Sequence, residues 1–380
     1  MGGGGTKSLV SMLRQAGLNG VEYEVVCPDE KGLTLYLRGN GVKVHVIPFR
    51  HAILPLNHSL KDKFKWLPRL IHNSWLNYKA IGSIMSIAKD FGAEIIHENS
   101  SVLNVGYQAA KKLNIPDVVH IREYGDLDFN LVIPGIENRL ASDSVYPISI
   151  TKDIARHRNQ LDNPHAAQIY NAVMKRSDLR YNPDKKMFFL YAGRVEECKG
   201  TTELIDAYIA YAVKEKTPLP LYVAGSTNFP AYQEALMSRV KKSGLDKYVK
   251  WLGERTDIAD IMYETVCTII PSRFEGFGRV MPEAMTNGSL CIGRNTGGTK
   301  EQLDNGRSIT GRDIAFAYDS VPELSSLLSD VARMVSSANP FVEGGEFHEM
   351  ILRSQRVVDS LYSEESFGSK LVDFYKRVLC

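Results

Sequence analysis

Two glutamates follow an apolar run in the segment PSRFEGFGRVMPE, residues 271–283. The preceding letters CTII read as a strand, so Glu275 stands at the carboxyl end of that strand and a helix begins near Gly278. The first turn of a helix has unpaired N–H groups, and Gly276 and Gly278 let the backbone approach a ligand closely. Carboxylates such as Glu275 and Glu283 accept neighbouring hydroxyls. The segment predicts a site for a sugar or ribose and for an anion.

A second segment, LYAGRVEECKG, supplies cations next to a strand end. It covers residues 190–200 and contains Gly193, Arg194 and Lys199. An arginine can bridge two phosphate oxygens, and a lysine is a movable point charge. A strand-end arginine and a helix-start lysine are ordinary features by themselves. Together with the glutamate segment, they predict a site for a diphosphate.

The opening letters MGGGGTKS allow four interpretations. A phosphate loop of the form G-x-x-x-x-G-K-[ST] is excluded, because Thr6 stands where that loop needs its last glycine. A myristoylation signal of the form M-G-x-x-x-[ST] and an expression scar remain open. The fourth interpretation is a glycine turn between a strand and a helix in a nucleotide-binding domain.

Composition limits the classes of function. The chain has 380 residues, 46 basic and 44 acidic, so we expect two domains and find no electrostatic case for nucleic acid. The five cysteines form no C-x-x-C pair, which argues against a zinc site or a disulfide framework and favours a reducing cytoplasm. No stretch reaches the roughly 20 apolar residues of a membrane-spanning helix. The cysteines are Cys27, Cys198, Cys267, Cys291 and Cys380.

Short apolar runs alternate with amphipathic stretches along the whole chain, which predicts βαβ units and parallel sheets. The rhythm stops at the polar segment 172–186, where we place the domain boundary. The expected architecture is α/β, with two Rossmann-like domains facing a central cleft: residues 1–175, residues 176–362, and a C-terminal helix at 363–380 that packs back on the first domain. The expected strands lie at 21–26, 42–47, 93–98, 117–123, 144–150, 188–193, 220–225, 249–253, 267–272 and 289–293.

The segment 58–79 mixes basic and aromatic residues. A solvated surface helix is the favoured interpretation, and a peripheral contact with an anionic membrane or a lipid-linked acceptor is the alternative. The residues concerned are Lys61, Lys63, Phe64, Lys65, Trp66, Leu67, Arg69, Trp75 and Lys79.

The sequence resembles the retaining glycosyltransferases of the GT-B superfamily, family 4 type. EGFGRVMPE is similar to the E-x7-E motif of that family, and GRVEECKG to its G-R-x-x-x-x-K-G turn. The resemblance covers nearly the whole chain and is strongest over 187–306. It implies transfer of a sugar, with retained anomeric configuration, from a nucleoside-diphosphate donor to a carbohydrate or lipid-linked acceptor, as in bacterial polysaccharide or glycolipid assembly. It also implies front-side attack and no metal or other cofactor.

The resemblance further assigns roles to individual residues. Arg194 and Lys199 would bind the donor diphosphate and Glu283 its ribose. Sugar hydroxyls would be held by Glu275 and the amides of Gly276, Phe277 and Gly278, and His120 would lie near the reacting centre.

Three assignments depend on position in the family's domains. Gly3 and Gly4 would form the glycine turn of the first domain, and the strand expected before them is absent from this sequence. Arg255 would contact the base, for which UDP is favoured over GDP. The motif Asp126-x-Asp128 is not expected to hold a metal, since Arg194 and Lys199 already supply cations for the diphosphate.

Rival functions remain open at this point. They are a nucleotide-sugar epimerase and a non-catalytic sugar-nucleotide-binding subunit of an assembly. A phosphorylase is disfavoured because no pyridoxal-phosphate lysine site is recognisable, and a dinucleotide dehydrogenase because no G-x-G-x-x-G follows a strand.

Overall fold

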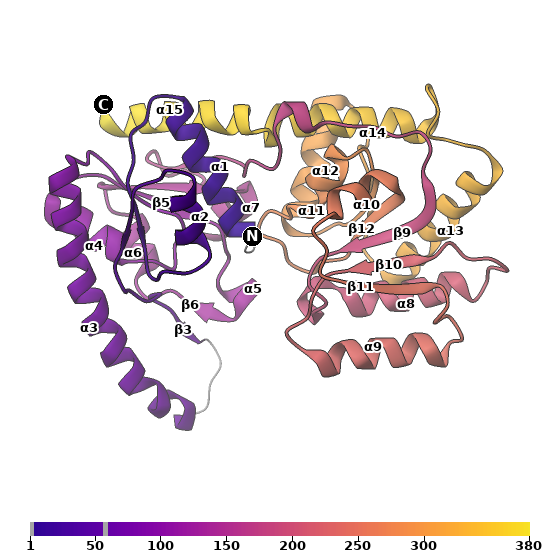
Figure 1. Cartoon of the computed structure of the whole chain (residues 1–380), viewed down its shortest axis with the longest axis horizontal. Coiled ribbons are helices and arrows are strands. Elements are labelled where there is room, and N and C mark those ends of the chain that lie inside the picture. The colour runs from indigo at the N-terminus through magenta and orange to yellow at the C-terminus, as the bar shows by residue number, and fades with distance from the viewer. Residues whose placement is uncertain (1–3, 56–59) are drawn as a thin grey trace. The chain divides into compact units, whose positions relative to one another are not determined.

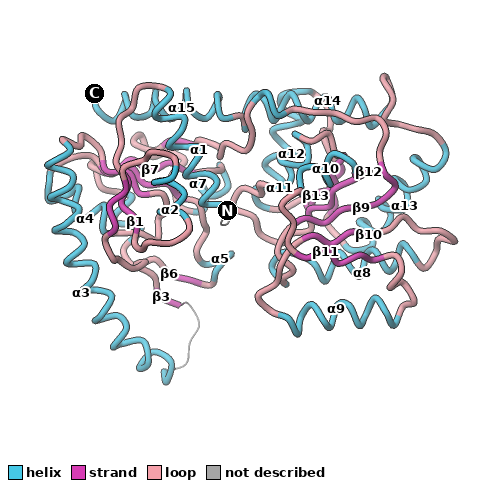
Figure 2. The backbone as a smooth tube through the Cα atoms, viewed as in Figure 1, coloured by secondary structure: helices cyan, strands magenta, loops and turns pink. Residues whose placement is uncertain are grey.

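The computed structural model describes residues 4–55 and 60–380 and divides into two compact units (Figure 1). One unit comprises Met1–Ala172 together with Glu364–Cys380, and the other comprises Val173–Ser363. Both are built from parallel strands with intervening helices, which is the α/β class that the alternating pattern predicts (Figure 2). No helix of the described residues is long and apolar enough to cross a bilayer.

The second unit contains one six-stranded sheet in the order β11-β10-β9-β12-β13-β14, and every pair is parallel. The order reverses between β9 and β12, so this is a doubly wound sheet. Its strands are β9 (Lys186–Ala192), β10 (Leu221–Ala224), β11 (Val249–Gly253), β12 (Thr265–Ile270), β13 (Leu290–Arg294) and β14 (Phe316–Tyr318). Its helices are η1 (Arg176–Asp178), η2 (Glu197–Lys199), α8 (Thr201–Ala212), α9 (Pro230–Lys242), α10 (Ile258–Glu264), α11 (Val280–Thr286), α12 (Gly297–Thr310), α13 (Val321–Ser337), α14 (Glu346–Val357) and η3 (Val358–Tyr362).

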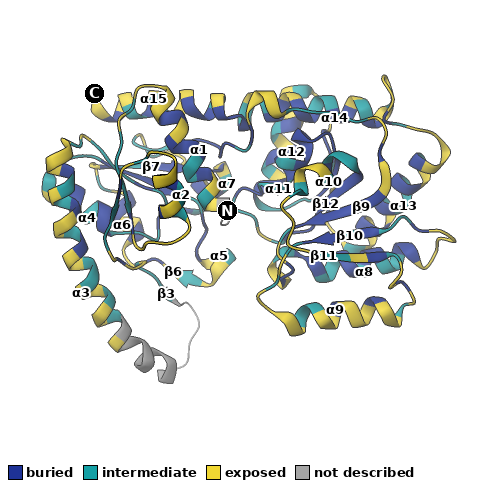
Figure 3. Cartoon of the chain, viewed as in Figure 1, coloured by how far each residue is buried: buried dark blue, intermediate teal, exposed yellow. Residues whose placement is uncertain are grey.

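The central strands of this sheet are buried on both faces (Figure 3). All six residues of β12 are buried, as are the last five of β9. Near-continuous apolar strands are typical of parallel sheets that are covered by helices on both sides. The core packs Phe189 and Ile269 of these strands with Leu204 of α8 and Leu328 of α13. The sheet is thus a rigid support for the loops at its carboxyl edge.

The first unit contains two parallel groups of strands, β1-β2 and β4-β5-β7-β8, and a short antiparallel pair, β3 with β6. Its strands are β1 (Val25–Cys27), β2 (Val44–Val46), β3 (Leu54–Pro55), β4 (Ile96–Glu98), β5 (Asp117–Ile121), β6 (Leu131–Val132), β7 (Val145–Ser149) and β8 (Ala167–Gln168). Its helices are α1 (Gly4–Leu18), α2 (Leu33–Gly39), α3 (Leu60–Phe91), α4 (Val105–Leu113), α5 (Asp126–Phe129), α6 (Ile136–Leu140), α7 (Lys152–His157) and α15 (Glu364–Leu379).

Several predicted strands are shorter in the structure. The expected strand at 21–26 is confined to Val25–Cys27, and the one at 93–98 to Ile96–Glu98. Strand β14 has no counterpart among the expected strands. At the amino end, Gly3 lies outside the described residues, and Gly4 is the first residue of α1 rather than part of a preceding turn.

Helix α15 belongs to the first unit, where it packs against α1. Leu371 and Phe374 of α15 join Met12 and Leu13 of α1 in one buried apolar cluster. The carboxylate of Glu364 accepts hydrogen bonds from the side chains of Ser11 (3.1 Å), Gln15 (3.3 Å) and Arg14. Polar contacts therefore fix the start of α15, and apolar contacts hold the rest of the helix against α1.

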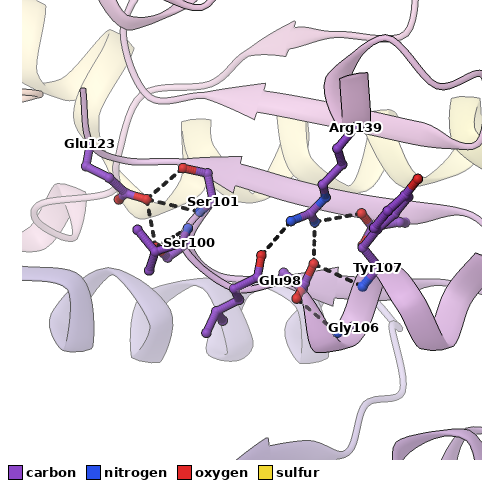
Figure 4. A network of polar contacts seen from close by, with 10 residues as sticks. Glu98, Ser100, Ser101, Gly106, Tyr107, Glu123 and Arg139 are labelled. Carbon is purple, nitrogen blue, oxygen red and sulfur yellow. Dashed lines mark hydrogen bonds and ion pairs between the residues drawn. The ribbon is translucent and has the colours of Figure 1, made fainter. Parts of the chain in front are cut away.

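A buried ionic cluster joins four elements of the first unit (Figure 4). The guanidinium of Arg139 on α6 pairs with Glu98 of β4 and lies 2.7 Å from Asp117 of β5. Glu98 also accepts the backbone N–H groups of Gly106 (3.0 Å) and Tyr107 (3.1 Å) at the start of α4. Burial raises the pKa of both carboxyl groups, that of Glu98 to about 7. One cation therefore compensates two desolvated acids.

Replacing this cation should cost stability. We expect Arg139→Met to lower the free energy of unfolding by about 3–5 kcal/mol, because it leaves two buried carboxyl groups without their counter-ion. Arg156→Met is the matched control, since Arg156 is exposed and pairs at 3.3 Å with the partly exposed Asp153. The control should change stability by about 1 kcal/mol or less. Urea denaturation measures both, and equal effects would show that the cluster does not stabilise the unit.

Candidate functional site

The candidate site is formed by two loops at the carboxyl edge of the second unit's sheet. Arg194 and Lys199 follow β9, and Glu275 follows β12. These strands are neighbours at the point where the strand order reverses. In open α/β sheets this is the place where ligands bind, because the loops on either side diverge there. The topology thus brings together residues that the sequence separates by about eighty positions.

Lys199 and Glu275 form the central contact of this site. The Nζ atom of Lys199 lies 2.7 Å from Oε1 of Glu275, and both side chains are largely but not fully buried. The hydroxyl of Ser272 donates to the same carboxylate oxygen at 2.7 Å. The pair therefore places a cation and a hydroxyl acceptor side by side at one strand end.

Arg194 is held by a second carboxylate. Its guanidinium lies 3.0 Å from Oε1 of Glu196, which is buried and also accepts from Nδ2 of Asn228 at 3.0 Å. The hydroxyl of Tyr191 donates to the Arg194 carbonyl at 2.6 Å. Burial, together with the charge of Glu275, raises the pKa of Tyr191 well above its usual value, so the phenol stays a neutral donor. These contacts fix the turn while the Arg194 side chain is half exposed.

Close backbone contact explains the glycine of the first turn. Gly200 has φ +71°, and a Cβ atom there would lie 1.9 Å from the Pro271 carbonyl oxygen. A side chain at position 200 would thus push the Lys199 turn away from the loop after β12. The N–H of Arg273 also donates to the Cys198 carbonyl at 3.2 Å. The two loops are in direct contact, which sets the distance between Lys199 and Glu275.

The loop from Gly276 to Gly278 is fixed by its neighbours. Phe277 is buried against Tyr362, and Gln302 of α12 donates to the carbonyls of Phe277 and Gly278. Gly278 has φ +77°, a conformation that favours glycine. The structure thus places the Phe277 ring in the core, so the expected contribution of this residue to a ligand site is limited to its backbone.

Glu283 lies on α11 and forms an i, i+4 pair with Arg279 at 3.3 Å. Burial lowers the pKa of Arg279 relative to an exposed arginine. In the loop after β11, Arg255 makes a two-point ion pair with Asp257, at 2.8 and 2.6 Å. The proposed contacts of Glu283 with ribose and of Arg255 with a base stay predictions.

His120 is fully buried in β5 of the first unit. Its imidazole stacks on that of His97, with Nδ1 2.7 Å from Nε2 of His97, and His97 in turn contacts the Tyr375 hydroxyl. Burial lowers the pKa of both histidines, that of His97 to about 3, so both are neutral near pH 7. This burial places His120 in the packed interior of the first unit in this structure, and its contact with a donor sugar stays a prediction.

Nearby, the two aspartates of the Asp126-x-Asp128 motif have structural partners. Asp128 accepts the N–H groups of Tyr124 (3.0 Å) and Gly125 (2.7 Å). Asp126 lies 2.7 Å from Nε2 of His157. These contacts close the turn that follows β5.

Sequence reasoning missed three residues that shape the site: Ser272, Glu196 and Asn228. Ser272 stands directly before the glutamate motif, so its place after a strand is a signal that was available. Glu196 lies inside the cation turn, where a carboxylate beside Arg194 suggests an ion pair. Asn228 lies 32 residues from Glu196 in the chain, and only the fold brings them together.

Comparison with known proteins gives the family context. Residues 177–328 match the family model "Glycosyl transferases group 1". Over 167 residues the chain is 30% identical to the lipopolysaccharide core biosynthesis mannosyltransferase LpsB of Rhizobium meliloti, which covers 43% of this chain and 44% of that protein. Over 223 residues it is 26% identical to the sucrose synthase of Nitrosomonas europaea, covering 53% of this chain and 27% of that protein. The chain thus spans less than half the length of these two relatives.

Solved structures extend the likeness to the whole chain. The protein Alr3699/HepE of Anabaena, in complex with UDP, matches with a TM-score of 0.76 and 16% identity, covering 99% of this chain and 96% of that one. A glycosyltransferase of Rickettsia africae matches with a TM-score of 0.76 and 14% identity, covering 98% and 94%. At these identities the likeness establishes the fold. The chain therefore has the GT-B fold of two Rossmann-like domains, and its residues 177–328 match the family model of the group 1 glycosyltransferases.

Proposed function

We propose that this protein is a retaining glycosyltransferase of family 4 type. It moves a sugar from a nucleoside-diphosphate donor, with UDP favoured, to an acceptor hydroxyl in the cytoplasmic assembly of a polysaccharide or glycolipid. The observation that carries the proposal is the Lys199–Glu275 pair at the carboxyl ends of β9 and β12. A cation for phosphate and an acceptor for hydroxyls lie together where a doubly wound sheet binds its ligand.

The proposed chemistry follows from where charge develops. Breaking a glycosyl–phosphate bond leaves negative charge on the diphosphate, so cations fixed beside it stabilise the transition state more than the ground state. Arg194 and Lys199 supply these cations. Glu275 and the amides of residues 276–278 hold the sugar hydroxyls, and Glu283 holds the ribose. In front-side attack the departing phosphate takes the acceptor proton, so no carboxylate nucleophile is required.

Donor binding changes the partner of Lys199. In the structure its ammonium neutralises Glu275 at 2.7 Å. A diphosphate brings a stronger anion to the same edge, which draws Lys199 away and leaves both oxygens of Glu275 to accept sugar hydroxyls. Ser272 keeps that carboxylate in place during the exchange, because it donates to Oε1. The preference for UDP is supported by the UDP complex of the Anabaena protein, which shares the fold.

The donor proposal predicts selective stabilisation by one nucleotide. We expect UDP to raise the melting temperature more than GDP, ADP or CMP, since ligand at 100 times its Kd adds about 2.7 kcal/mol to stability. The shift should persist in EDTA, because Arg194 and Lys199 replace a metal. Differential scanning fluorimetry with each of the four nucleotides, and with UDP in the presence of EDTA, tests this prediction. A shift that EDTA abolishes would contradict the metal-free site. A larger shift with GDP would contradict the preference for UDP and favour a GDP-linked donor.

The proposed role of Glu275 predicts that its replacement lowers turnover without lowering the affinity for UDP. Glu275→Gln should lower kcat roughly 100-fold, because the lost charge weakens contacts made to the sugar in the transition state. UDP affinity should be kept or increased, since Lys199 loses its competing partner. Glu234→Gln on the exposed surface of α9 is the matched control and should leave both unchanged. Calorimetry with UDP and initial rates with UDP-sugar measure the two effects. Wild-type turnover in Glu275→Gln would remove this residue from the mechanism, and isomerised donor without acceptor consumption would favour an epimerase.

An acceptor on an anionic membrane is supported by one face of α3. Ile71, Trp75 and Tyr78 are exposed at helical spacing, and the ammonium of Lys79 lies 3.8 Å from the Trp75 ring centroid. The side chains of residues 61–67 and of Arg69, which include the other basic residues of this segment, lie outside the described part. Aromatic and basic residues on one face suit the interface of an anionic bilayer.

This membrane contact is testable with vesicles. The double variant Ile71→Ser with Trp75→Ser should lower partitioning onto phosphatidylglycerol vesicles about tenfold or more, since burying each large apolar side chain contributes about 1.5–3 kcal/mol. Phe229→Ser, at an exposed site in the second unit, is the control and should have no effect. Co-sedimentation gives the partition coefficient. Equal partitioning of all three proteins would leave α3 as a solvated surface helix.

A further inference from the structure

Three polar side chains form a chain of hydrogen bonds inside the first unit, from α15 to the interior of the sheet. The hydroxyl of Tyr375 on α15 lies 2.5 Å from Nδ1 of His97 on β4. Nε2 of His97 lies 2.7 Å from Nδ1 of His120 on β5, and the two imidazoles stack with their centroids 4.8 Å apart. His120 is fully buried, and its Nε2 has no hydrogen-bond partner among the described residues. The chain of contacts therefore ends at a buried nitrogen whose own hydrogen bond is not made.

The register of β4 and β5 places these side chains on one face of the sheet. His97 lies opposite Val118 in the parallel pair, and His120 is two residues further along β5. Because alternate residues of a strand point to the same face, His120 shares the face of Val118. Val118 packs with Phe374 of α15 in one apolar cluster, so this face is the one that α15 covers. Tyr375 follows Phe374 directly, which brings its hydroxyl to the histidine pair.

The three side chains are neutral near pH 7. Burial lowers the pKa of both histidines, that of His97 to about 3, and the nearby charge of Arg122 acts in the same direction. Burial also raises the pKa of Tyr375, so its phenol keeps its hydrogen. A neutral imidazole has one donor nitrogen and one acceptor nitrogen. A single hydrogen therefore lies between the two rings, and the ring that carries it decides the tautomer of both histidines.

Two arrangements of the hydrogens agree with these contacts. In the first, Tyr375 donates to Nδ1 of His97, whose Nε2–H donates to Nδ1 of His120, and the hydrogen of His120 is on Nε2. In the second, both hydrogen bonds run in the opposite direction. The hydroxyl hydrogen of Tyr375 then has no acceptor in the described part of the chain, and Nε2 of His120 is an acceptor without a donor. The first arrangement leaves one polar group unsatisfied and the second leaves two, so the first is favoured.

We propose that His97 and Tyr375 are positioning residues, which hold the imidazole of His120 in the tautomer that donates from Nε2 to an oxygen of the donor sugar. The inference rests on the proposed function and on the place near the reacting centre that the resemblance implies for His120. His120 is the fourth of the five residues of β5, next to the carboxyl edge where open α/β sheets bind ligands. A sugar oxygen supplies the acceptor that the buried N–H lacks, since a buried donor without an acceptor is unfavourable. Helix α15 thus determines which nitrogen of His120 carries the hydrogen.

Nuclear magnetic resonance of the imidazole nitrogens tests the tautomers directly. The chain has nine histidines, so isotope labelling of histidine alone gives a small set of proton–nitrogen correlations. We expect the hydrogen of both His97 and His120 on Nε2. Tyr375→Phe keeps the ring and removes the hydroxyl, so both histidines should become mixtures of the two tautomers. Tyr36→Phe, which alters a tyrosine packed against the same apolar cluster, is the control and should change neither. Hydrogen on Nδ1 of His120 in the unmodified chain, or tautomers that Tyr375→Phe leaves unchanged, overturns the proposal.

Turnover of UDP-glucose shows whether the tautomer matters for a bound sugar. Tyr375→Phe should lower kcat about three- to tenfold, as expected for the loss of one ordered hydrogen bond. Its affinity for UDP should stay unchanged, because UDP lacks the sugar that is transferred. His97→Gln is the conservative variant, since its amide N–H can donate to His120 and its oxygen can accept from Tyr375. It should keep most of the turnover, whereas His97→Leu should lower kcat about three- to tenfold. Equal turnover in the two His97 variants contradicts a positioning role.

These outcomes are separate from a failure of the proposed function. If the unmodified chain neither binds UDP nor turns over UDP-glucose, the proposed function fails, and the tautomers of His97 and His120 alone decide the positioning role. If UDP binds and both Tyr375→Phe and His97→Leu keep full turnover, the positioning role is overturned while the donor site stands. If the melting curve shows that His97→Leu does not fold, Tyr375→Phe decides, because it removes a single oxygen atom.

Discussion

The direct contact between two strand-end loops determines the candidate donor site. Strands β9 and β12 run parallel as neighbours, so the loops that follow them leave the same edge of the sheet. Gly200 then lies so close to the Pro271 carbonyl that a Cβ atom has no room. This contact fixes the spacing between the Lys199 turn and the Glu275 loop. Because both strands are buried in a helix-covered sheet, the loops have a rigid support and their polar side chains need little further ordering on binding.

Charge is balanced within the site before any ligand binds. Arg194 pairs with Glu196, Lys199 with Glu275, and Arg279 with Glu283. A partly buried cation without a counter-ion would be costly, so the protein's own carboxylates hold the cations in place. In the proposed function, a diphosphate would replace Glu275 as the partner of Lys199, and the Ser272 hydroxyl and the sugar hydroxyls would then be the partners of that carboxylate. Lys199 is the cation best suited to this exchange, since its flexible stem can follow the new anion while Ser272 retains the carboxylate.

The sequence predicts which residue types lie at strand ends, but not which of them are in contact. Glu275, Glu283, Arg194 and Lys199 could be singled out because their residue types follow apolar strands, and the α/β class could be predicted from alternating runs. The ion pair of Lys199 with Glu275 could not, since it depends on which strands are neighbours. His120 shows the same limit: the resemblance implies a place near the reacting centre, but its stacking on His97 and its complete burial depend on packing from β4 and α15. The lengths of the strands expected at 21–26 and 93–98 were overestimated, because apolar residues there line a cavity and contact helices as well as a paired strand.

The buried ionic cluster explains how β4 keeps its position at the edge of its group of strands. A three-residue edge strand with one strand partner has few ladder bonds, and its apolar side chains alone do not define its register. Glu98, its last residue, is bonded to the amides that begin α4 and to Arg139, which also binds Asp117 of the neighbouring β5. A register shift of one residue would move this carboxylate to the other face of the sheet. Arg139 would then lose one of its two carboxylate partners and keep only Asp117. The cluster therefore holds β4 in register beside β5.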